Sequence, residues 1–149
     1  MKIDPIKTLS KHINNIPFNK LLGLTIKSID SNKVILTFPS SENLIGNYLY
    51  GILHGGVISS VLDMAGGTAA MVAAIHKKKD ATPEELEAHI GKSSTINLHI
   101  DYIKPGRGTE FITHAWIMHS GNKITFTRME LYNQAEHLIA SGSGTYLIS

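Results

Sequence analysis

The residues best suited to carry out chemistry are a lone carboxylate, Asp63, and the run His54-Gly55-Gly56 shortly before it. Glycines at the start of a helix leave backbone N–H groups uncovered at the positive end of its dipole, where an oxyanion is stabilised. A carboxylate further along can deliver or activate a nucleophile. Together they predict chemistry at a carbonyl group. Alone, the run is also typical of a tight turn, and Asp63 of a solvated helix carboxylate.

These residues belong to the one long stretch with helical periodicity, from His54 to about Lys77. One face of this helix is apolar and predicts packing on a sheet; it carries Val57, Ile58, Val61, Leu62, Met64, Ala65, Ala69, Val72 and Ile75. The other face carries small residues around one carboxylate: Gly56, Ser59, Ser60, Asp63, Gly66, Gly67 and Ala70. Because each glycine costs about 1 kcal/mol of helix propensity relative to alanine, we expect a ligand or a second subunit to approach this face closely.

The remaining elements follow from alternation and helix caps. Six strands are expected, at about 21–30, 33–38, 95–103, 109–119, 123–133 and 137–148. A helix begins at Pro5, N-capped by Asp4, and ends at Ile16-Pro17. A shorter helix runs from Thr82 to about Ile90 and is stopped by Gly91, and residues 39–50 form a loop. Strands around one central helix predict an α+β fold, with an antiparallel sheet packed on that helix in a single domain over 1–149.

Composition excludes several classes of function. The chain has 149 residues and no cysteine, which excludes disulfides, thiolate metal sites and a cysteine nucleophile. A net charge of +2 is too small to predict nucleic-acid binding. The histidines lack metal-ligand spacing, and we expect no metal or redox cofactor. No signal sequence and no stretch able to span a membrane are expected, so the predicted location is cytoplasmic.

Two segments resemble a known family. The run Ile52–Val57 followed by Leu62–Gly66 is similar to the signature of hot-dog-fold acyl-CoA thioesterases of the phenylacetate-pathway (PaaI-like) type, in which HGG precedes a helix aspartate at this spacing. Further motifs resemble the medium- and long-chain acyl-CoA thioesterases of the YigI type, among them Pro17-Phe18-Asn19, Thr95-Ile96-Asn97-Leu98 and Lys104-Pro105-Gly106-Arg107-Gly108. The likeness covers nearly the whole chain.

The resemblance implies a hot-dog fold that hydrolyses acyl-CoA to a free acid and coenzyme A. Two protomers would join their sheets, with active sites at the interface, as a homodimer or a dimer of dimers. Asp63 would act as nucleophile or general base, and the Gly55 amide would polarise the thioester carbonyl. His54 would shape that turn or bind the carbonyl side of the substrate. Asn47 would position the carboxylate or the water, and Thr95 would orient the water from the other subunit.

Coenzyme A carries phosphates, and three cations at strand ends or turns are either phosphate ligands or solvated: Lys104, Arg107 and Lys123. Candidates for an apolar acyl slot are Tyr48, Leu49, Tyr50 and Met71, although ordinary core packing is the favoured interpretation of Met71. Two other functions stay open, a non-catalytic acyl-CoA binding module and a hot-dog hydratase or dehydratase. Chain-length preference is a property of three-dimensional shape and is not predicted.

Overall fold

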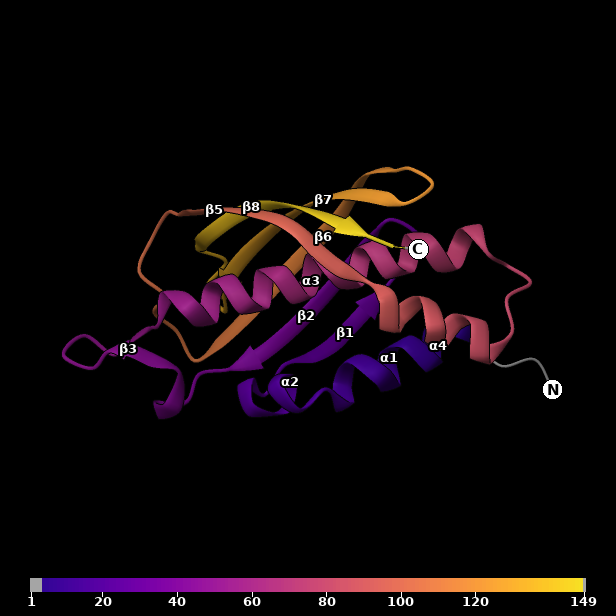
Figure 1. Ribbon diagram of the computed structural model, residues 1–149. Helices are drawn as coiled ribbons and strands as arrows, with labels where there is room; N and C mark the ends of the chain where they lie inside the picture. Colours follow the sequence, from indigo (N-terminus) through magenta and orange to yellow (C-terminus); the bar gives the residue numbers. More distant parts are fainter. Residues whose placement is uncertain (1–3, 149) are drawn as a thin grey trace.

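A six-stranded antiparallel sheet wraps around one long helix, α3, in the computed structural model, which describes residues 4–148 (Figure 1). The strand order is β1-β2-β6-β7-β8-β5. Its strands are β1 Thr25–Ile29, β2 Lys33–Pro39, β5 Ser94–Tyr102, β6 Glu110–Ser120, β7 Ile124–Asn133 and β8 Leu138–Leu147. The helices are α1 Pro5–Asn15, α2 Pro17–Leu22, α3 Gly55–Lys77 and α4 Pro83–Lys92. The expected α+β hot-dog architecture is confirmed; residues 1–3 and 149 of the expected domain lie outside the described residues.

Helix α3 is held by its apolar stripe. Side chains such as Val61, Leu62 and Val72 are fully buried and pack with the inward-facing residues of β2, β6 and β7. By length and composition alone this helix could cross a membrane. The expectation that no stretch is long and apolar enough to do so was therefore wrong. In the fold, 61% of its most apolar window is buried, because the sheet covers it.

Three local expectations differ from the structure. The proline at position 17 does not only end α1; it begins α2, because a fixed φ suits the first helical position. Helix α4 continues through Gly91 to Lys92 and ends at Ser93, since a glycine inside a helix is tolerated where other contacts hold the turn. The expected loop at 39–50 contains a 3₁₀ turn, Glu42–Leu44, and strand β3.

Strand β3, Ile45–Asn47, pairs with β4, Ile52–Leu53, in a hairpin that projects beyond the N-terminal end of α3 (Figure 1). Its close approach to the helix start depends on Gly46. A Cβ atom at this position would lie 2.6 Å from the Cα atom of His54. The glycine therefore permits the backbone contact that fixes the turn into α3.

Candidate active site

The start of α3 presents one backbone amide without a partner. His54 is the N-cap residue, and its Nδ1 atom accepts a hydrogen bond from the Gly56 N–H at 2.8 Å. The Val57 N–H donates to the His54 carbonyl at 3.0 Å. Within residues 4–148, the Gly55 N–H has no acceptor. The chain thus has an open donor at the end of the helix where the dipole favours an anion.

Hydrogen bonds from the preceding loop and from β5 fix the turn that leads into α3. The His54 N–H donates to the Leu44 carbonyl at 2.8 Å, and the Leu53 N–H donates to the Gly106 carbonyl at 3.0 Å. The Tyr102 hydroxyl, from the end of β5, donates to the Gly55 carbonyl at 3.1 Å. These bonds hold the Gly55 peptide in one orientation, a contribution of Tyr102 that was not predicted from the sequence.

Asp63 lies two turns further along, half-buried against β5 and β8. Thr95 donates a hydrogen bond to its Oδ1 atom at 2.9 Å. The Tyr146 hydroxyl lies 3.2 Å from the same Oδ1 atom and 3.1 Å from the Asp63 backbone carbonyl. No residue in the described part of the chain donates to Oδ2.

A cavity of about 100 Å³ opens beside this carboxylate. Its wall combines the polar groups of Asp63, Thr95 and Tyr146 with apolar side chains. The apolar part comprises Met64, Met71 and Ile148. A carboxylate with a free oxygen at the edge of a mixed polar and apolar cavity can act on a substrate that has a polar reacting centre and an apolar tail.

Tyr146 was not predicted as a site residue. Its ring is buried, and burial, followed by the negative charge of Asp63, raises the pKa of its hydroxyl. The phenol is therefore a proton donor at any working pH. The sequence signal that could have found it is the glycine pair on the small face of α3. A Cβ atom at Gly66 would lie 2.5 Å from the Tyr146 hydroxyl, so a side chain of the same chain approaches this part of the face.

Of the two polar residues predicted to act beside Asp63, Thr95 contacts it and Asn47 does not. Thr95 contacts Asp63 of its own chain, which differs from the expectation that Thr95 comes from the other subunit. The reason is that β5 lies at the sheet edge beside β8, alongside α3. Asn47 is exposed, and its Oδ1 atom accepts the Leu49 N–H at 3.1 Å, which closes the hairpin turn. Within this chain, Asn47 does not contact the carboxylate.

The predicted acyl-slot residues also separate. Tyr48, Leu49 and Tyr50 lie at the tip of the β3–β4 hairpin and are 64–85% exposed. They form no slot within one chain. Met71, in contrast, lines the cavity beside Asp63 and packs against the core.

The three predicted phosphate ligands do not form one patch. Lys104 and Arg107 lie between β5 and β6, near the start of α3, where Arg107 donates to the Tyr50 carbonyl at 3.3 Å. Lys123 lies in the β6–β7 turn. The neighbouring carbonyl of Gly121 accepts from Lys77 at 2.6 Å, which places this turn at the opposite end of α3. The β6–β7 turn lies near the C-terminal end of α3, whereas the connection from β5 to β6 lies near its start (Figure 1), so Lys123 does not share a patch with the other two cations.

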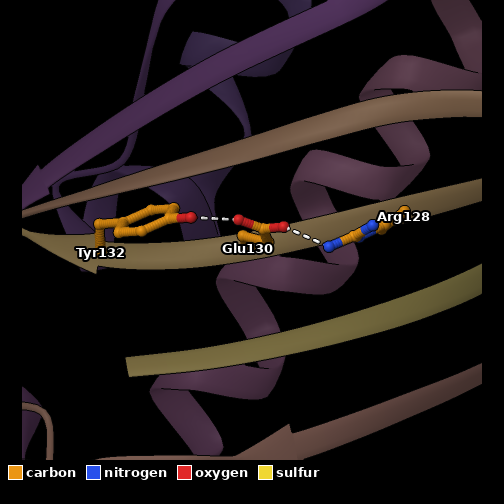
Figure 2. Close-up of polar contacts among 3 residues, drawn as sticks. All are labelled: Arg128, Glu130 and Tyr132. Atoms are coloured by element: carbon orange, nitrogen blue, oxygen red, sulfur yellow. Dashed lines mark hydrogen bonds and ion pairs between the residues drawn. The ribbon is translucent and has the colours of Figure 1, made fainter. Parts of the chain in front are cut away.

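A second polar cluster lies on the outer face of the sheet. Figure 2 shows Arg128, Glu130 and Tyr132 in a row along β7, with Arg128 donating to Glu130 at 2.6 Å and Tyr132 donating to its other oxygen. The hydrogen bond to Glu130 raises the pKa of Tyr132. Beside them, burial and then the charge of Lys33 lower the pKa of His114. Because side chains alternate along a strand, this cluster faces away from α3 and Asp63.

Comparison with known proteins assigns the family. A sequence model of the thioesterase superfamily matches residues 50–140. The medium/long-chain acyl-CoA thioesterase YigI of Escherichia coli (strain K12) is 33% identical over 136 residues, which is 91% of this chain and 88% of that protein.

Solved structures agree with this match. A Shewanella oneidensis protein related to the thioesterase superfamily superposes with a TM-score of 0.91 at 38% identity, covering 96% of this chain and 94% of that one. The Escherichia coli PaaI protein from the phenylacetic acid degradation operon shares the fold, with a TM-score of 0.77 at 18% identity over 97% and 93% of the two chains. The resemblance in the motifs is confirmed, and the chain belongs to the thioesterase superfamily.

Proposed function

We propose that the protein hydrolyses acyl-CoA thioesters to free acid and coenzyme A, with Asp63 as the reacting carboxylate. The observation that carries this proposal is the Asp63 carboxylate itself, which lines the cavity and is held through Oδ1, while no residue among 4–148 donates a hydrogen bond to Oδ2. Membership of the thioesterase superfamily supports the reaction class. The similarity to YigI, a medium/long-chain acyl-CoA thioesterase, supports acyl-CoA as the substrate.

Two chains are needed to complete the site. Gly55 and Asp63 are eight residues apart on one helix, and a rise of 1.5 Å per residue separates them by about 12 Å along its axis. A thioester carbonyl must lie about 3 Å from both the oxyanion donor and the nucleophile. One chain therefore cannot supply both. A second copy, with its α3 antiparallel to the first, would bring its Gly55 amide beside this Asp63.

The free edge of the sheet supports this homodimer. Within the described part of the chain, strand β5, which is nine residues long, pairs with β8 and has no strand on its other edge. Ile96 and Tyr102 are 51% and 55% exposed there, although both are large and apolar. A long open edge with apolar side chains favours pairing with another strand. Joining β5 to a second β5 would cover these residues and make one continuous sheet.

In that dimer the acyl chain would occupy the apolar side of the cavity, against Met64 and Met71. Lys104 and Arg107 lie near the start of α3 of their own chain, so in the dimer they would accompany that chain's Gly55 to the shared site and would bind the phosphates of coenzyme A. Asn47, on the projecting hairpin, would reach the partner's carboxylate. A preference for medium or long acyl chains, a dimer of dimers and a cytoplasmic location stay predictions.

A thiol-release assay with acyl-CoAs of graded chain length tests the function. We expect the wild type to release thiol and Asp63→Asn to release none. The asparagine Oδ1 atom can still accept from Thr95 and Tyr146, so the variant should remain folded with the same oligomeric state. Circular dichroism and light scattering check this. Acyl-CoA binding without thiol release from the wild type would favour a binding module instead.

A further inference from the structure

We infer that Tyr146 is a positioning residue that, with Thr95, holds Oδ1 of Asp63 and thereby assigns the chemistry to Oδ2. This inference rests on the proposed function, because it names the oxygen that acts on the thioester. Thr95 donates to Oδ1 at 2.9 Å, and the single hydroxyl proton of Tyr146 is shared between the same oxygen at 3.2 Å and the Asp63 backbone carbonyl at 3.1 Å. Among the described residues, none donates a hydrogen bond to Oδ2.

The site is built around the Tyr146 ring. Three glycines surround it, two on α3 and one on its own strand β8: Gly66, Gly67 and Gly144. A Cβ atom at Gly144 would lie 2.6 Å from the ring, and one at Gly67 would lie 3.4 Å from it. Two of these glycines lie inside a helix, where each costs about 1 kcal/mol relative to alanine. The two helix glycines therefore lower the helix propensity of α3 and leave the space in which the Tyr146 hydroxyl reaches Asp63.

The hydroxyl of Tyr146 can act only as a donor toward the carboxylate. A carboxylate without fixed donors rotates about its Cβ–Cγ bond, and its two oxygens exchange places. Two donors on Oδ1, one from β5 and one from β8, stop this exchange. In the proposed reaction Oδ2 then either attacks the thioester carbon or takes a proton from the attacking water. When Oδ2 takes the proton from water, that proton passes to sulfur as the C–S bond breaks, and free acid and the thiol of coenzyme A result. When Oδ2 attacks the carbon, coenzyme A leaves as a thiolate and a mixed anhydride remains; water then hydrolyses the anhydride, restores the Asp63 carboxylate and supplies the proton for the thiolate.

The test is Tyr146→Phe, which removes the hydroxyl and keeps the ring between the glycines. Tyr132→Phe is the matched control, because it removes the same group from the outer face of the sheet. The titration midpoint of the Asp63 carboxyl carbon is followed by ¹³C NMR and assigned by its loss in Asp63→Asn. This readout does not need activity. Steady-state kinetics with decanoyl-CoA over a range of pH give the second readout.

Loss of a hydrogen bond to the charged form makes the acid harder to ionise. In Tyr146→Phe we therefore expect the carboxyl midpoint and the acidic limb of kcat/KM to move to higher pH. We expect kcat to fall about tenfold, with KM changed less than about threefold, since the hydroxyl binds Asp63 and not the substrate. Tyr132→Phe should change none of these.

The outcomes separate the two proposals. An unchanged carboxyl midpoint in Tyr146→Phe would overturn the role of Tyr146, whatever the wild-type activity. A lower kcat with an unchanged acidic limb would also overturn it, because a merely structural defect gives that pattern. If the midpoint moves while the wild type releases no thiol, the positioning role stands and the proposed hydrolysis fails.

Discussion

The oxyanion role of Gly55 can be tested by removing one N–H group. Gly55 is the first residue of α3, a position that proline tolerates because its fixed φ suits the helix and its missing N–H has no partner inside it. The preceding residue, His54, has φ −62° and ψ 136°, the extended conformation required before proline. Gly55→Pro should therefore fold while losing the amide that we propose to polarise the carbonyl.

Gly55→Ala is the matched control, because it keeps the N–H and adds only a Cβ atom. That atom would lie 3.4 Å from the Tyr102 ring, which is half exposed and can move slightly. Removing one oxyanion donor costs about 10²- to 10³-fold in kcat, or roughly 3–4 kcal/mol. We expect this loss for Gly55→Pro and a change within about threefold for Gly55→Ala. Thiol release and thermal unfolding are measured together. A folded Gly55→Pro with the kcat of Gly55→Ala would refute the oxyanion role.

Three further predictions concern packing, chain length and pH. Gly66→Ala should lower the free energy of unfolding, measured in urea, by about 1–3 kcal/mol, because the new Cβ atom would lie 2.5 Å from the Tyr146 hydroxyl. Gly91→Ala is the control: its Cβ atom would meet open space, so it should raise the free energy of unfolding by up to about 1 kcal/mol. Met71→Ala should extend the cavity beside Asp63 and move the optimum of kcat/KM to longer acyl chains. Each additional methylene that the larger cavity buries should raise kcat/KM by about fourfold. An unchanged optimum would contradict the assignment of this cavity to the acyl chain. The pKa of His114 is lowered in the folded protein. As pH falls below 6.5, His114 is therefore protonated in the unfolded chain at a higher pH than in the folded protein, and the free energy of unfolding decreases over this range. His114→Phe should show a smaller drop in Tm between pH 6.5 and pH 5 than the wild type, and equal drops would contradict the assignment.

The sequence predicts the fold well where the signals are local. The periodicity after His54 gives α3, and alternation gives the six strands of the sheet, within a few residues. Proline 17 was misread because the same residue can end one helix and begin the next. The hairpin was missed because β3 and β4 are three and two residues long, too short to show alternation.

The site is predicted only in part, because its contacts are not local. Asp63 and Gly55 were identified by residue type and spacing on one helix. The Tyr146 hydroxyl comes from a strand 83 residues away in the sequence. The only sequence signal for it is the glycine pair on α3, which indicates that another group packs closely against that face of the helix. Lys123 was grouped with Lys104 and Arg107 because all three follow strands, and only the topology places it at the far end of α3.

The central claim is that Asp63 of one chain works with Gly55 of another, and mixed dimers test it most directly. Alone, Asp63→Asn should be inactive and Gly55→Pro should retain at most about 1% of the wild-type kcat. When the two are unfolded and refolded together, a heterodimer contains one intact site, made of Asp63 from one chain and Gly55 from the other. Random pairing then predicts recovery of about a quarter of wild-type thiol release. No recovery above the separate variants, in a mixture shown to contain heterodimers, would contradict a site shared between chains.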